Sequence, residues 1–86
     1  MVLYGAEMEI DVRVFATLRR YLPDLAIGEP LRMTVKEGVT LGEVCDQLGI
    51  RRAEVKVILQ NSVKVEFDAL AHTGDRIAFF PAVGGG

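Results

Sequence analysis

The residues best placed to do chemistry in this chain are its last four, Val83-Gly84-Gly85-Gly86. Glycine has no side chain to bury and loses the most backbone freedom when it is fixed, so three glycines add little to a core. They predict a thin, flexible tail whose terminal carboxylate, on Gly86, can enter a narrow active site of another protein. The alternative is an ordinary disordered terminus or a scar of expression cloning, and the tail alone does not separate these interpretations.

Other reactive residue types are too few to build an active site. The chain has one cysteine, Cys45, and one histidine, His72. A single cysteine excludes an intrachain disulfide and any multi-cysteine metal site, and no nucleophile–histidine–carboxylate set can be argued. No phosphate-binding glycine motif occurs either. We therefore expect no metal site and no independent enzyme, with Cys45 in the core and His72 in a solvated loop.

The composition is that of one small domain. Half of the 86 residues are hydrophobic, which is enough for a core without disulfides. The net charge of −2, from 10 basic and 12 acidic residues, argues against nucleic acid as a partner because no cations are in surplus to neutralise phosphates. No apolar run approaches the roughly 20 residues of a membrane span, and no signal peptide opens the chain. These features predict a cytoplasmic protein with a loose leader over residues 1–7, one domain over 8–83 and a flexible tail over 84–86.

Local patterns predict the elements that position the tail. Residues 8–16 alternate strictly, with Ile10, Val12 and Val14 on one face, as a half-buried strand does. Thr40 and Glu43 form a capping-box pattern at the start of a helix over residues 40–48. That helix has one apolar stripe, made of Leu41, Val44, Cys45 and Leu48.

Further patterns complete the order of elements. A short helical turn is expected over residues 17–22, and strands over 31–35, 55–60, 63–67 and 76–83. Strands that flank one helix in this order predict an α+β β-grasp fold, in which a mixed sheet packs on one main helix. The first and last strands must then lie side by side.

Three apolar residues are predicted on the side of the sheet that faces solvent: Phe15, Ile58 and Phe80. In this interpretation Val57 and Leu59 point inward. Single exposed apolar residues are normal, but three on one sheet face form a patch, and such patches bind partners. Phe80 and Pro81 make this patch continuous with the glycine tail.

Residues 74–86, GDRIAFFPAVGGG, resemble the carboxyl end of the MoaD/ThiS sulfur carriers, which are bacterial relatives of ubiquitin. Residues 12–19, the helix start at 40–44 and the turn at Asn61 match this family as well, so the resemblance covers about residues 8–86. The aromatic-aromatic-proline sequence and the chain length are most like the MoaD branch, the small subunits of molybdopterin synthase. Ala82, in place of a second proline, and the Val-Gly-Gly-Gly ending are closer to the ThiS branch.

The resemblance implies a sulfur carrier that binds no cofactor itself. An adenylyltransferase of the MoeB/ThiF type, which resembles ubiquitin-activating enzymes and uses ATP and Mg²⁺, would activate the carboxylate of Gly86. A persulfide donor would then convert it to a thiocarboxylate for a MoaE-like large synthase subunit, which builds molybdopterin for molybdenum or tungsten enzymes. Gly85 and Gly86 would allow passage through a channel too narrow for side chains, with Gly84 in the same tail. The residues expected to bind these partners are Phe15, Phe80, Ile58 and Pro81.

Three alternatives remain open. A ThiS-type carrier would serve thiamine thiazole synthesis, and a ubiquitin-like modifier would be joined through Gly86 to lysines of other proteins. A purely structural interaction domain would not need the glycine tail.

Overall fold

The computed structural model describes residues 6–82. Within this range the chain forms five strands, one α-helix and two short 3-10 helices. In chain order they are β1 (Glu7–Val14), η1 (Ala16–Tyr21), β2 (Leu31–Lys36), α1 (Leu41–Gln47), η2 (Arg52–Glu54), β3 (Val57–Gln60), β4 (Val63–Val65) and β5 (Arg76–Phe80). In the same part of the chain, no helix is long and apolar enough to cross a membrane.

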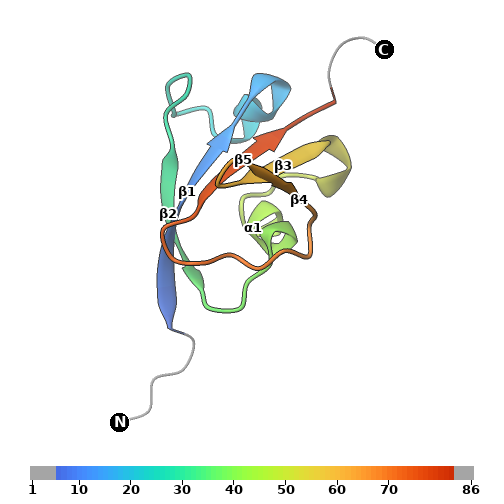
Figure 1. The fold of residues 1–86 in the computed structure, drawn as a ribbon. Helices are drawn as coiled ribbons and strands as arrows, with labels where there is room; N and C mark the ends of the chain where they lie inside the picture. Colours follow the sequence, from blue (N-terminus) through green and yellow to red (C-terminus); the bar gives the residue numbers. More distant parts are fainter. Residues whose placement is uncertain (1–5, 83–86) are drawn as a thin grey trace.

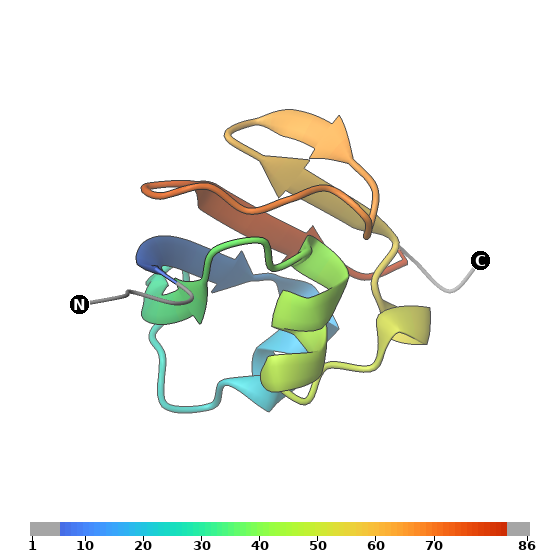
Figure 2. The same cartoon turned by 90° about the horizontal axis from the view of Figure 1, so that it is seen from below.

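The strands form one mixed sheet in the order β2-β1-β5-β3-β4 (Figure 1). The last strand, β5, lies between β1 and β3; it is parallel to β1 and antiparallel to β3. The first and last strands are therefore adjacent, as predicted. Figure 2 shows α1 and both short helices on one side of the sheet. This arrangement confirms the α+β β-grasp prediction.

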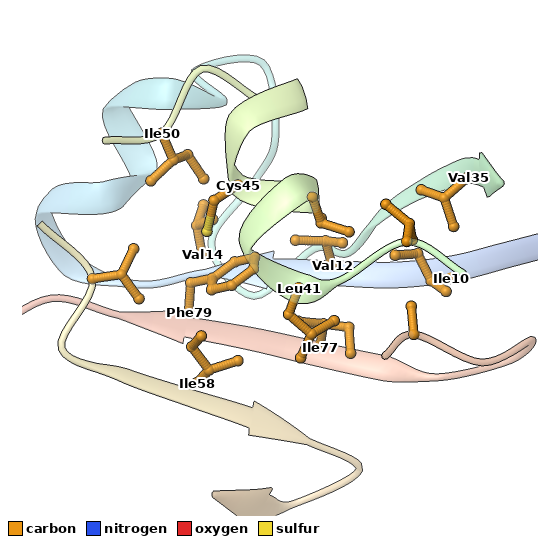
Figure 3. Packing of buried hydrophobic residues seen from close by; sticks show 14 of the residues in the cluster. Ile10, Val12, Val14, Val35, Leu41, Cys45, Ile50, Ile58, Ile77 and Phe79 are labelled. Carbon is orange, nitrogen blue, oxygen red and sulfur yellow. The ribbon is translucent and has the colours of Figure 1, made fainter. Parts of the chain in front are cut away.

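The core lies between the sheet and α1. Alternate residues of β1 point into it, from Met8 to Val14, because successive side chains of a strand face opposite sides. Phe79 of β5 is completely buried and lies at the centre of the packing in Figure 3. Leu18 of η1 is also completely buried, so this short helix closes one end of the core.

Local chemistry fixes the ends of α1. The hydroxyl of Thr40 accepts a hydrogen bond from the Glu43 N–H, at 3.1 Å, and the Glu43 carboxylate accepts one from the Thr40 N–H, at 2.9 Å. This is the predicted capping box. Gly49, just after the helix, has a φ of 75°, a conformation that glycine adopts without strain.

β1 ends at Val14 rather than Ala16, and the last three strands are shorter than predicted as well. β3 begins at Val57 rather than Val55, because η2 precedes it and Val55 is the C-cap of that helix. β4 ends at Val65 rather than Phe67. β5 ends at Phe80, and Pro81, which has no N–H to donate to a ladder, follows it. Val83, the predicted end of this strand, lies outside the described residues.

Candidate functional site

Two aromatic rings stack where β5 ends, on the side of the sheet opposite α1. We call this side the open face. Phe80 is the last residue of β5, and Phe15 follows directly after β1. Their ring centroids lie 4.6 Å apart and the ring planes differ by 3°. Both residues are partly buried, since each ring covers a face of the other. We call Phe15 and Phe80 the aromatic pair.

The backbone holds the aromatic pair on a firm base. The N–H of Phe15 donates to the carbonyl of Phe79 at 3.2 Å, and the N–H of Lys56 donates to the carbonyl of Phe80 at 2.7 Å. β5 is therefore bonded up to Phe79 on the β1 side and up to Phe80 on the β3 side. β5 ends at Phe80, so the described chain leaves the sheet directly after this pair.

Ala16, next to Phe15, has a φ of 53°. A side chain in this left-handed region costs roughly 1 kcal/mol, and the position turns the chain from β1 into η1. Phe15 is thus fixed between the paired strand before it and a sharp turn after it.

The prediction for Ile58 is wrong. Ile58 is only 3% exposed and points into the core beside Phe79 (Figure 3). The antiparallel register pairs these two residues directly, so they share a face of the sheet. Val57 pairs with Phe80 and Leu59 with Ala78, so these neighbours of Ile58 lie on the open face instead. Both are partly buried there.

The other predicted site residues lie at or beyond the end of β5. Pro81 is partly buried and follows Phe80 directly, so it continues the open face toward the carboxyl end. Gly84, Gly85 and Gly86 lie outside the described residues. Their roles in threading and in chemistry stay predictions.

A buried carboxylate that no local sequence pattern indicates organises the start of β5. Asp75 is 6% exposed. It accepts hydrogen bonds from the Gln60 side chain at 2.7 Å, the Asn61 side chain at 2.8 Å and the His72 N–H at 2.7 Å. Asn61 in turn accepts a bond from the Arg76 N–H at 2.9 Å. The network ties the β3–β4 turn to the first residue of β5.

The same network keeps Asp75 ionised. Burial alone would raise the pKa of this carboxyl, but the hydrogen bonds from Gln60, Asn61 and His72, with the nearby His72 ring, lower it overall. A carboxylate that is this buried and accepts this many hydrogen bonds stabilises the fold and is not accessible to act as a base on a substrate.

Cys45 and His72 have the surroundings that the sequence predicts. Cys45 is completely buried on α1, and burial, helped by the charge of Asp46, raises the pKa of its thiol to about 12. A thiol in that state is not a nucleophile at neutral pH. The His72 side chain is 74% exposed in its loop, with Nδ1 at 3.7 Å from the Asp75 carboxylate. Among residues 6–82, no group of three or more potential metal ligands comes together.

The sheet, its single covering helix and the aromatic pair beside the departing chain define a ubiquitin-like β-grasp protein. Within that class, the chain belongs to the Mut7-C ubiquitin family, whose model matches residues 7–84. No curated protein sequence is significantly similar to it.

Solved structures with the same fold are available for comparison. The HVO 2177 protein of Haloferax volcanii is 27% identical, with a TM-score of 0.72, over 93% of this chain and 88% of that one. Small archaeal modifier protein 1 of the same organism is 18% identical, with a TM-score of 0.69, over 88% and 99%. A proposed molybdopterin converting factor subunit 1 from Pyrococcus furiosus is 21% identical, with a TM-score of 0.68, over 88% and 99%. The predicted resemblance is thus confirmed at the level of a ubiquitin-like protein, and its molybdopterin branch stays a prediction.

Proposed function

We propose that this chain is a cytoplasmic sulfur carrier that acts as the small subunit of a molybdopterin synthase. In this proposal Gly86 bears the thiocarboxylate, and the aromatic pair docks on the partner proteins. The observation that supports it most is the position of the aromatic pair, on the open face at the point where β5 ends and the glycine-rich segment follows. A partner that binds these rings also holds the segment that carries the reactive group.

The chemistry explains why such a carrier needs an activating partner. A carboxylate resists nucleophilic attack, so ATP must first convert it to an acyl-adenylate, with release of pyrophosphate. A persulfide sulfur then attacks the acyl carbon and AMP leaves with one carboxylate oxygen. Reductive cleavage of the sulfur–sulfur bond by a thiol frees the thiocarboxylate. The only cysteine of the chain is buried and protonated, so the sulfur has to come from a separate donor.

Intact-mass analysis of the protein from its own cells tests the central step. Protein that ends at Gly86 and has sulfur in place of one oxygen supports the proposal. The same analysis, made after incubation with the adenylyltransferase, ATP and a persulfide donor, should show no sulfur on a variant with one alanine added after Gly86. An alanine added before Met1 serves as the matched control and should load normally. A loaded extended variant would contradict the proposal.

A second function, that of a ubiquitin-like protein modifier, has support from the fold shared with small archaeal modifier protein 1. A modifier would appear in cell extracts as conjugates whose isopeptide bonds join Gly86 to lysines. A sulfur carrier would instead lose its sulfur to a pterin in the presence of a large synthase subunit. Co-purification with a thiazole synthase would favour the thiamine branch. If truncation of residues 84–86 leaves the cellular role intact, both functions fall in favour of a structural interaction domain.

A further inference from the structure

The open face contains a small hollow lined by charged residues. The proposed function assigns no role to these residues. The volume of the hollow is about 120 Å³. Ala78 of β5 is its floor, because this small side chain lies between two larger residues in register, Arg13 on β1 and Leu59 on β3. Ser62 and Arg76 complete the rim. We call it the two-arginine hollow.

In the described part of the chain, both arginines have guanidinium N–H donors that are not used in ion pairs. Within residues 6–82, no carboxylate lies within ion-pair distance of the Arg13 or Arg76 guanidinium. Arg13 donates through Nε to the carbonyl of Gly28 at 3.2 Å, which orients the side chain and leaves its terminal nitrogens free for a ligand. Arg76 is exposed.

The charged residues that line the hollow, Arg13 and Arg76, are both cations. The nearest acidic residue in register is Asp11, which pairs with Arg76 across the parallel strands. Its carboxylate bonds instead to Nε of Arg32, at 3.1 Å, on the opposite side. Lys64 lies across from Leu59 on β4 and adds a further cation. This end of the open face is therefore positive, although the chain as a whole has a net charge of −2.

The form of the hollow favours a carboxylate side chain over a phosphate. Its floor belongs to the central strand β5, whose backbone groups pair with β1 and β3. A ligand in the hollow would therefore meet the hydrogen-bond donors of side chains. Phosphate sites usually add several free backbone N–H groups, whereas a planar guanidinium suits a carboxylate bidentately. Leu59 and Ala78 make the rest of the lining apolar, and β5 leads directly from Ala78 to the aromatic pair.

We propose that the two-arginine hollow receives an aspartate or glutamate side chain of the protein that docks on the aromatic pair. The partner surface would then combine an apolar contact for the rings with an acidic residue beside it. The identity of the partner rests on the proposed function, but binding of a carboxylate in the hollow can be tested without it.

The site can be tested by titrating the ¹⁵N-labelled full chain with defined probes. An amidated peptide, Gly-Glu-Leu-Phe-Glu-Gly, should shift the amide signals of Leu59, Ala78 and Phe80 in a saturable way. The matched peptide with glutamine for glutamate, and inorganic phosphate, should not. No shifts at the hollow, equal shifts with the glutamine peptide, or equal shifts with phosphate would overturn the proposal.

Variants then assign the effect to the two arginines. The double variant Arg13→Gln, Arg76→Gln should bind the acidic peptide roughly tenfold more weakly, as expected for lost charge-assisted hydrogen bonds. Lys36→Gln with Arg51→Gln, which makes the same change in net charge away from the hollow, should bind like wild type. Equal losses in both double variants would mean that only overall charge matters.

Activation kinetics separate this inference from the proposed function. With the adenylyltransferase and ATP, the Arg13→Gln, Arg76→Gln variant should need a higher carrier concentration for half-maximal rate, with kcat unchanged because the tail is intact. If wild type is not activated, the proposed function fails while the peptide titration still decides the site. If wild type is activated and the variant shows an unchanged KM, the partner does not use the hollow.

Discussion

Replacing Phe80 with alanine should separate the role of the open face from that of the core. The lost stack of the aromatic pair is worth about 0.5–1.5 kcal/mol, and Phe80 is only partly buried, so little further burial is lost. We expect the free energy of unfolding to fall by about 1–2 kcal/mol. A small domain with a stability of roughly 5–10 kcal/mol stays folded after such a loss.

Its neighbour Phe79 provides the matched control. This residue is completely buried, and truncation of such a phenylalanine typically costs about 3–5 kcal/mol. Urea unfolding followed by far-UV circular dichroism gives both values, with equal m-values as the check that the denatured states are comparable. Phe15→Ala, alone and combined with Phe80→Ala, should show a coupling of about 1 kcal/mol between the two rings.

The same variants should then differ in partner binding. Phe80→Ala, and more strongly Phe80→Arg, should weaken binding of the adenylyltransferase while the circular dichroism spectrum stays that of wild type. A loss of stability as large as that of Phe79→Ala would refute the reasoning, because Phe80 would then belong to the core. Unchanged partner binding by a folded Phe80→Arg variant would refute the docking role.

Two further predictions concern Asp75 and the β3–β4 turn. Asp75→Asn should lower the free energy of unfolding by about 2–3 kcal/mol, because its new amide group meets the donors that the carboxylate accepted. Since folding lowers the pKa of Asp75, its contribution is complete above the ordinary pKa of aspartate and is lost as the pH falls through the folded value. Urea midpoints at several pH values should therefore fall more steeply toward acid in wild type than in the variant, which keeps only the acid loss of the other carboxylates. Ser62→Gly should raise the free energy of unfolding by about 0.5–1 kcal/mol, since Ser62 has a φ of 73° in the β3–β4 turn and an Asn-Gly pair suits that turn, and a lower thermal midpoint would contradict this.

The elements that could be predicted from sequence have local causes. β1 alternates strictly, so its period alone assigns its buried face. The start of α1 depends on Thr40 and Glu43, which are three residues apart and satisfy each other. The place of β5 beside β1 follows from the order of elements, because one helix occupies the crossover.

The features that could not be predicted depend on distant partners. Val57, Ile58 and Leu59 are all apolar, so a period of two cannot tell which of them faces the core, and only the pairing of Ile58 with Phe79 decides. The Asp75 carboxylate accepts hydrogen bonds from two side chains that lie 14 and 15 residues earlier in the chain, and no local pattern indicates these contacts. The two-arginine hollow likewise forms only when β1, β5 and β3 pair in their observed register.

The short connection between the aromatic pair and Gly86 limits where a partner can do its chemistry. Residues 81–86 number six, and six fully extended residues span at most about 20 Å. If Phe80 docks and Gly86 reacts in the same complex, the reacting centre of the partner must lie within that distance of the docked ring. β5 is bonded to β1 up to Phe79 and on the β3 side up to Phe80, so the connection can lengthen only if these pairs break. The proposed function therefore couples recognition to reaction by geometry, and a partner that held the rings beyond this reach could bind the chain but could not use its carboxyl group.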